Sequence, residues 1–189
     1  MGIRDAKKYI GELHKKQSNP YMWPDFLTGL PDKVAIITKL DEVYPKIGEY
    51  SVSLVRIANV QPYLNKYGPS KHIEIIEWAA AILKSTADKY NGLFIGAFST
   101  HDFIAMGKSS DIKKFFKEAS DLFDKKVLEF YTEKDRQNRL VFSFMRDGVR
   151  IDVGLMKLLN VSIEDKKDCQ KTQILQNLVN LCAVCEIPS

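Results

Sequence analysis

The chain has 189 residues, 45% of them hydrophobic and 28% charged, with a formal net charge of +4, which suits one folded domain. Lys and Arg are interleaved with Asp and Glu throughout, whereas a nucleic-acid-binding domain gathers its basic residues on one face. No apolar run approaches the roughly 20 residues of a membrane span, and the N-terminus lacks a signal-peptide core. We therefore expect a cytoplasmic protein that binds neither nucleic acid nor a membrane.

The N-terminal part predicts two helices joined by a turn. Residues 3–17 form a charged amphipathic pattern, which Pro20 ends because proline cannot continue a helix. Residues 23–33 are rich in turn-forming residues and lead into a second helix over 32–45. The first 19 residues are thus expected to form a lead-in helix that precedes the main domain.

The middle of the chain predicts a strand, a long helix and a hairpin. Residues 51–60 are rich in Val, Leu and Ile, as in a buried strand. Residues 73–89 carry apolar side chains at helical spacing. Two short strands, 93–98 and 103–106, then flank a polar tetrapeptide (STHD), which we expect at an exposed hairpin tip.

The C-terminal part predicts a helix, a second hairpin, a strand and a final helix. Ser109 or Ser110 is expected to cap a helix that runs to about Lys126. The two strands of the second hairpin, the next strand and the final helix are expected over residues 140–145, 149–153, 155–163 and 168–184. An Asp-Gly pair supplies a strong turn signal for this hairpin. No repeat or linker interrupts the chain, so we predict one α/β domain of the α+β type.

Three cysteines, Cys169, Cys182 and Cys185, fit a reducing compartment. A zinc site needs about four ligands, and no second Cys or His pair lies at a suitable spacing from Cys182 and Cys185. A redox Cys-x-x-Cys motif normally opens a helix after a strand, whereas this one closes a helical pattern. We interpret these two as helix-face thiols without chemistry, and expect no metal and no cofactor.

Three local motifs resemble the GGDEF family of diguanylate cyclases. Residues 25–33 (DFLTGLPDK) look like the family's Asp-x-Leu-Thr-Gly-Leu-Pro motif, with Asp and Lys at the end where Asn and Arg are usual. Residues 54–68 end in Asn-Lys-Tyr-Gly and resemble the strand–helix segment that ends in Asn-Asp-x-Tyr-Gly in the family. Residues 99–103 occupy the signature hairpin, where only Phe103 agrees in identity.

Residues 130–136 (FYTEKDR), the second hairpin and residues 154–163 (GLMKLLNVSI) also resemble a GGDEF subgroup with an extra hairpin before its last strand. The resemblance covers about residues 20–165. It implies a nucleotidyl-cyclase-like domain over residues 20–189, in which helices flank a central, mostly antiparallel sheet and a helix closes the chain.

The resemblance also implies that the metal site is lost. Condensing two GTP molecules requires divalent cations, and hard cations bind carboxylate oxygens. The family's metal-binding Asp in the first strand aligns with Arg56, and the second carboxylate of that strand aligns with Ala58. A guanidinium cannot ligate a metal and repels one, so no metal is expected here.

The signature hairpin is altered as well. Its two glycines, which let the backbone approach the phosphates closely, are replaced by Ser99 and Thr100. The acidic position after them is His101, and the next position, a metal ligand in active members, is Asp102. One carboxylate therefore remains of a set that needs several.

Nucleotide recognition is similarly affected. The positions that read the guanine base in the family align with Leu64 and Ile73, which cannot hydrogen-bond a base edge. The inhibitory product site, Arg-x-x-Asp, aligns with Tyr90 and Leu93. The resemblance therefore implies a degenerate domain without diguanylate cyclase activity.

Two of these residues suggest specific hypotheses. In one hypothesis Arg56 occupies the metal position and pairs with Asp102. In the other, each side chain points to solvent, where an ion pair contributes only about 0–1 kcal/mol. His101 titrates near neutrality but has no nucleophile beside it, so we interpret it as a surface turn histidine rather than a general base. His72 stands alone among charged helix residues and receives no role.

Three function classes remain. We favour a non-catalytic signalling or scaffolding module that binds a protein partner or itself. The alternative is a binding-only receptor for GTP, cyclic-di-GMP or another nucleotide. The residues at positions 56, 58, 64 and 73 argue against the third class, an active cyclase.

Overall fold

The computed structural model describes residues 25–186, so the helix expected over residues 3–17 lies outside the described part. Four strands form the central sheet, and each neighbouring pair is antiparallel. In sheet order they are β2 (Phe94–Ala97), β3 (Asp102–Lys108), β1 (Tyr50–Ala58) and β6 (Lys157–Ile163). The predicted α+β class with an antiparallel sheet is confirmed.

Six α-helices surround or extend this sheet within the described residues. They are α2 (Lys33–Val43), α3 (Val60–Tyr67), α4 (His72–Ala87), α5 (Ser109–Val127), α6 (Glu133–Asn138) and α7 (Ile174–Glu186). Short 3₁₀ turns follow or precede them at Tyr44–Lys46, Leu128–Phe130, Lys166–Asp168 and Lys171–Gln173. The chain order β1-α-β2-β3-α5-β6 is that of a split βαβ motif.

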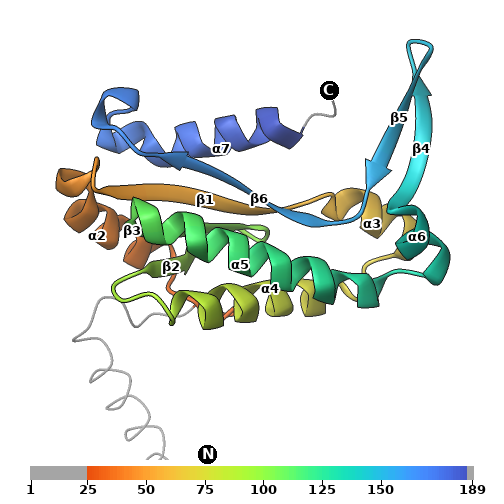
Figure 1. Cartoon of the computed structure of the whole chain (residues 1–189), viewed down its shortest axis with the longest axis horizontal. Helices are drawn as coiled ribbons and strands as arrows, with labels where there is room; N and C mark the ends of the chain where they lie inside the picture. The colour runs from red at the N-terminus through yellow and green to blue at the C-terminus, as the bar shows by residue number, and fades with distance from the viewer. Residues whose placement is uncertain (1–24, 187–189) are drawn as a thin grey trace, which may run out of the picture.

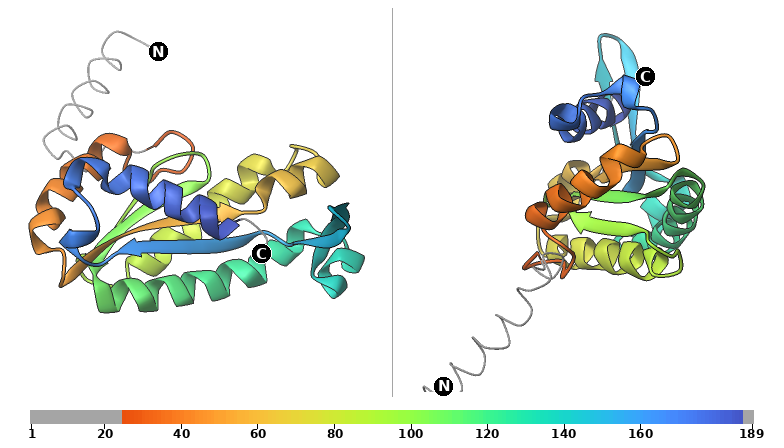
Figure 2. Two further views of the ribbon diagram at one scale, coloured as in Figure 1. Left: turned by 90° about the horizontal axis from the view of Figure 1, so that it is seen from above. Right: turned by 90° about the vertical axis from the view of Figure 1, so that its left-hand side faces the viewer.

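The helices cover both faces of the sheet, with α4 and α5 below it and α7 above it in Figure 1. Figure 2 shows that α2 lies on the same side as α7. Side chains of a strand alternate between its two faces, so Val55 and Ile57 enter the cluster of α4 and α5, whereas Val52 and Leu54 enter that of α2 and α7. The apolar run of β1 thus reflects a strand that is buried on both faces.

The second hairpin forms a separate two-stranded sheet, β4 (Leu140–Arg146) with β5 (Val149–Gly154), which projects away from the domain in Figure 1. Asp147 and Gly148 at its tip have φ values of 50° and 78°. Positive φ at both central residues is the requirement of a type I′ turn, which Asp-Gly meets. The turn predicted at this Asp-Gly pair is therefore confirmed.

Side chains of α3 hold the base of this projecting hairpin. The Lys66 ammonium lies 2.6 Å from the Asp135 carboxylate of α6 and donates to the Val141 carbonyl at 2.5 Å. The Tyr67 hydroxyl also donates to Asp135, which is buried. These contacts link α3, α6 and β4, so the position of the hairpin is set by a polar network as well as by packing.

Most element boundaries shift by one to three residues from the sequence predictions, and the starts of two helices differ for reasons that their contacts explain. Helix α5 begins at Ser109, and its cap residue is Lys108, which makes no side-chain cap bond. The Ser109 hydroxyl donates instead to the Glu49 carbonyl at 3.2 Å. The final helix begins at Ile174 rather than near residue 168, because residues 166–173 form two 3₁₀ turns.

We predict that Gly96→Ala destabilises the protein by about 1–3 kcal/mol, the usual cost of overpacking a core. A Cβ at Gly96 in β2 would lie 2.7 Å from Ile36 Cγ1 and 3.0 Å from the Pro31 carbonyl oxygen. The matched control is Gly107→Ala in β3, whose nearest contact would be 3.4 Å, to Leu93. Urea unfolding measures both variants, and equal stabilities would contradict the prediction.

Candidate functional site

An ion pair joins the centre of the sheet to the tip of the first hairpin. Arg56 in β1 and Asp102 in β3 are directly opposite in the strand register. Arg56 Nε donates to Asp102 Oδ1 at 2.6 Å, and its Nη2 donates to Oδ2 at 3.1 Å. Their side chains are 14% and 11% exposed. The hypothesis that Arg56 pairs with the remaining carboxylate is therefore confirmed.

The hairpin turn holds Asp102 in this position. The amides of Phe98 and Ser99 both donate to the Asp102 carbonyl, at 2.9 and 3.0 Å. The Ser99 hydroxyl donates to Asp102 Oδ2 at 3.0 Å. Both carboxylate oxygens thus accept hydrogen bonds within the protein, and a metal would have to displace the guanidinium to reach them.

A contact between two histidines corrects the sequence interpretation. His72 Nε2, at the start of α4, lies 2.7 Å from His101 Nε2 in the hairpin turn. His101 is half-buried rather than a surface turn residue, and His72 is not isolated. Because one imidazole nitrogen must donate and the other accept, the pair is linked by a single proton. The bond ties the hairpin to α4.

This environment changes the acidity of His101. Burial lowers the pKa of the His101 imidazole, and the nearby His72 and Arg56 lower it further, while Asp102 acts in the opposite direction. The neutral form is therefore favoured in the folded protein, which agrees with an imidazole pair that shares one proton.

The other residues singled out from the sequence do not join this cluster. Ala58 is buried at the end of β1, and Leu64 packs against the core. Ile73 is 59% exposed on α4. The Tyr90 hydroxyl donates to Glu118 at 3.4 Å, and Leu93 packs on the core. Thr100 is exposed at the hairpin tip. It lines a cavity together with Ser99 and with side chains from residues 25–33.

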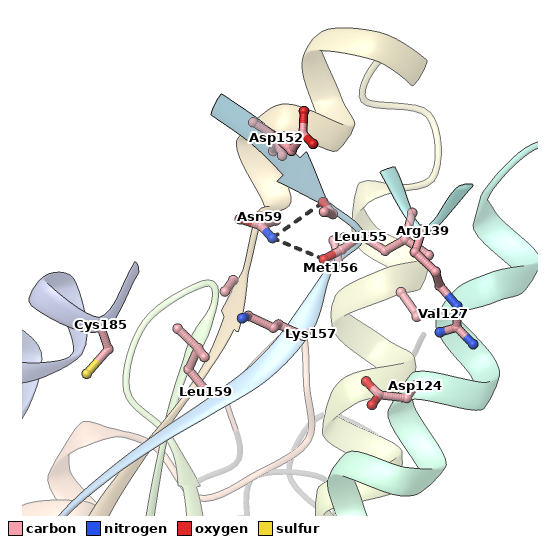
Figure 3. A pocket seen from close by; sticks show the side chains of 13 residues that line it. Asn59, Asp124, Val127, Arg139, Asp152, Leu155, Met156, Lys157, Leu159 and Cys185 are labelled. Atoms are coloured by element: carbon pink, nitrogen blue, oxygen red, sulfur yellow. Dashed lines mark hydrogen bonds between the residues drawn. The ribbon is translucent and has the colours of Figure 1, made fainter. Parts of the chain in front are cut away.

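A cavity of about 450 Å³ lies at the C-terminal end of β1, where Ala58 and Asn59 line it (Figure 3). Asn59, at the turn between β1 and α3, has a φ of 61°, and its amide donates to the Gly154 and Leu155 carbonyls at 3.4 and 3.1 Å. Further side chains come from α5, the base of the projecting hairpin, β6 and α7. The charged and thiol-bearing members are Asp124, Arg139, Asp152, Lys157 and Cys185.

The cavity has a mixed charge. Arg139 and Lys157 supply two cations, and Asp124 and Asp152 two carboxylates. Burial raises the pKa of the Asp124 carboxyl, although Arg139 and Lys157 act against this rise. Sequence analysis missed this cavity because its walls come from five separated segments that share no local pattern. The nearest signal was Cys185, which is exposed whereas Cys182 is buried.

Two features are absent from residues 25–186. Within this part of the chain, no three His, Cys, Asp or Glu side chains gather closely enough to hold a metal ion. None of its helices is both long and apolar enough to cross a membrane.

We predict that Arg56→Met lowers the free energy of unfolding by about 3 kcal/mol, because it leaves a buried carboxylate without its partner. The matched control is Arg150→Met in the projecting hairpin, whose ion pair with Asp152 is exposed at 63% and 54%. That change should cost at most about 0.5 kcal/mol. Denaturant unfolding of both variants is the measurement, and a small loss for Arg56→Met would contradict a structural role.

We also predict that the histidine pair makes stability depend on pH. Because the folded-state pKa of His101 is lowered, the unfolded chain binds more protons once the pH falls below its ordinary value of about 6.5. His101 thus contributes stability above that pH and loses it as the pH falls through the folded-state pKa. Urea unfolding at pH 7.5 and 5.5 should show a larger loss for the wild type than for His101→Gln. Equal losses would contradict the prediction.

Comparison with known proteins places this geometry. No family model and no curated protein sequence matches the chain. Solved structures do match, including the GGDEF domain of DgcB from Caulobacter crescentus in complex with c-di-GMP, at 14% identity and a TM-score of 0.56 over 85% of this chain and 88% of that one. The FimX GGDEF domain from Pseudomonas aeruginosa matches at 13% identity and a TM-score of 0.55 over 86% and 92%.

A third structure is that of diguanylate cyclase SiaD from Pseudomonas aeruginosa in complex with its activator SiaC. It matches at 11% identity and a TM-score of 0.61 over 97% of this chain and 65% of that one. At these identities the likeness concerns the fold. The chain has the fold of GGDEF domains.

Proposed function

We propose that this chain is a catalytically inactive GGDEF-like domain that serves cyclic-di-GMP signalling as a protein-interaction module. The observation that carries the proposal is the Arg56–Asp102 ion pair, at 2.6 Å and largely buried. It occupies the positions that the resemblance assigns to metal ligands. A cation stands where the reaction needs a divalent metal, and the remaining carboxylate is already bonded.

The electrostatics support this reading. Mg²⁺ is bound through oxygen ligands, usually including one or two carboxylates. Arg56 carries a permanent positive charge and would repel such an ion, while Ala58 offers no ligand atom. Asp102 accepts hydrogen bonds from both Arg56 and Ser99. Binding a metal would therefore break the ion pair and leave the guanidinium beside it.

The recognition positions support it too. His72 and His101 bond to each other between α4 and the hairpin, so the hairpin backbone is fastened to the helix that would carry the base-reading residue. That residue is Ile73, an exposed apolar side chain.

A protein-interaction role fits the exposed apolar side chains. Phe144, Met145 and Val149 on the projecting hairpin are 44%, 66% and 60% exposed, and Leu181 and Val184 on α7 are 49% and 70% exposed. Exposed apolar side chains that gather on one element are typical of protein-binding surfaces. SiaD, which has the same fold, was solved with a protein activator.

The second candidate is a receptor for an anionic nucleotide. The cavity of about 450 Å³ favours it, because Arg139 and Lys157 line it beside the β1–α3 turn. Cavities that hold small molecules begin at about 300 Å³. The DgcB domain was solved with c-di-GMP, whose phosphates would require such cations in this chain.

We predict that the protein forms no cyclic-di-GMP from GTP with Mg²⁺ or Mn²⁺, because it lacks the carboxylates that hold the metal. We also expect no shift in Tm on titration with GTP, GDP or cyclic-di-GMP, with or without Mg²⁺. A ligand at 100 times its Kd would stabilise the fold by about 2.7 kcal/mol, which is readily detected. Product formation would refute the proposal.

A saturable shift without turnover would favour the receptor instead. In that case Arg139→Asn should abolish the shift, since it removes a cavity cation while keeping a residue that tolerates the positive φ of 54°. The matched control is Lys117→Gln, on the exposed side of α5 and outside the cavity. A shift that both variants retain would place the ligand elsewhere.

A further inference from the structure

The outer edge of β6 differs from that of β2, the strand at the opposite end of the central sheet. The Ile57 amide of β1 donates to the His101 carbonyl, on the β3 side, at 2.9 Å. Successive residues of a strand direct their backbone groups to opposite sides. Arg56 therefore bonds toward β6, where its partner in the register is Leu159.

In β6 this alternation directs the N–H and C=O groups of Leu158, Asn160 and Ser162 away from the sheet. No hydrogen bond from another residue of the described range 25–186 reaches these groups. At the opposite edge of the sheet, by contrast, the Pro31 carbonyl accepts a hydrogen bond from the Ala97 amide of β2 at 2.8 Å. Residues 25–186 thus cover part of one edge and leave the other open.

The β6 edge also lacks the usual protection. Monomeric proteins guard edge strands with charged residues, proline or bulges. Between Lys157 and Glu164 the strand contains neither a charged residue nor a proline. Its pairing with β1 is regular from Lys157 to Ile163. The six residues 158–163 thus form an unprotected edge, which is a template for another strand.

A groove of about 490 Å³ lies beside this edge on the α7 face. Its apolar lining is Ile163 of β6 with Leu181 and Val184 of α7, which are 49% and 70% exposed. Ser162, Asn177 and Asn180 complete the lining. Strand addition to a sheet edge combines backbone hydrogen bonds with a place for alternate side chains. The edge and the groove together provide both.

We infer that this edge binds the β6 strand of a second copy of the chain, antiparallel, with the two-fold axis at Asn160. In this register Asn160 faces Asn160 of the second copy, and Leu158 faces its Ser162. These are the residues that point outward, and each such antiparallel pair exchanges two hydrogen bonds. Every outward N–H and C=O group of the three residues is then satisfied.

The side chains and charges select the same arrangement. Leu159 would face Val161 of the second copy on the α7 face, an apolar cross-strand pair of a stabilising kind. Lys157 begins the strand, whereas Glu164 and Asp165 follow its end. Antiparallel pairing sets the basic end of each strand against the acidic end of the other. Parallel pairing would set like charges together.

The assembly closes at two copies. The contact is isologous, so it uses the β6 edge of both chains. The other sheet edge is partly covered by the chain itself through Pro31. The inference rests on the proposed interaction role and names its partner. It does not involve the Arg56–Asp102 ion pair, whereas Lys157 and Leu159 of the pairing strand also line the cavity.

Sedimentation velocity over a range of concentrations tests the pairing. We expect a reversible dimer for the wild type and a monomer for Asn160→Pro, whose missing N–H points away from the sheet and costs no backbone bond within the chain. The change also removes Asn160 Oδ1, which accepts a hydrogen bond from the Ser162 hydroxyl at 3.0 Å. The matched control is Asn160→Ala, which loses the same side-chain bond to Ser162 but keeps the backbone N–H and should remain dimeric. A monomeric wild type, or a dimer that survives Asn160→Pro, would overturn the inference.

Amide hydrogen exchange of the wild type gives a residue-level readout that does not depend on any variant folding. The amides of Leu158, Asn160 and Ser162 should exchange more slowly as concentration rises, while those of Leu159 and Val161, which face β1, should not change. If these amides became protected only when a different protein was added, the partner would be that protein and not a second copy, and the inference would be overturned. The two tests are independent. A monomeric protein would not contradict the predicted absence of GTP condensation, and GTP turnover would not contradict the pairing of the β6 edges.

Discussion

The central strand β1 imposes the condition on which the rest of the structure depends. It is hydrogen-bonded along both edges, to β3 and to β6, and its side chains are buried on both faces of the sheet. A charged group on such a strand must find its counter-charge within the protein, because an unpaired buried ion is very costly. Arg56 meets the condition only because the register sets Asp102 opposite it. The register of the sheet and the ion pair of the site therefore depend on the same two residues, Arg56 and Asp102.

Much of the fold could be predicted from local patterns in the sequence. The run of Val, Leu and Ile in β1, the Asp-Gly turn and the helical spacing of α4 each depend on neighbours within a few residues. The ion pair could also be predicted, because the resemblance aligns Arg56 and Asp102 with one metal site. The start of α5 could not, since the Ser109 hydroxyl bonds a carbonyl 60 residues away rather than its own helix.

The features that escaped prediction depend mainly on contacts between segments far apart in the chain. His72 and His101 are separated by 29 residues, and neither position carries a pattern that points to the other. The late start of α7 has a similar cause. Lys166 donates to the Pro45 carbonyl at 2.6 Å, and the Asn177 amide donates to the buried Cys169 thiol at 3.0 Å. These contacts hold the preceding turns against the domain, where helical propensity alone would have extended the helix.

The bidentate contact between Arg56 and Asp102 also bears on whether a metal site could be rebuilt one substitution at a time. Arg56→Asp alone would set two carboxylates face to face in a largely buried position, where like charges raise one another's pKa and weaken the strand pairing. Ala58→Asp alone would bury a third polar group without a partner. Each single substitution is destabilising before any metal can bind, so the ion pair opposes the gain of a metal site by one substitution at a time.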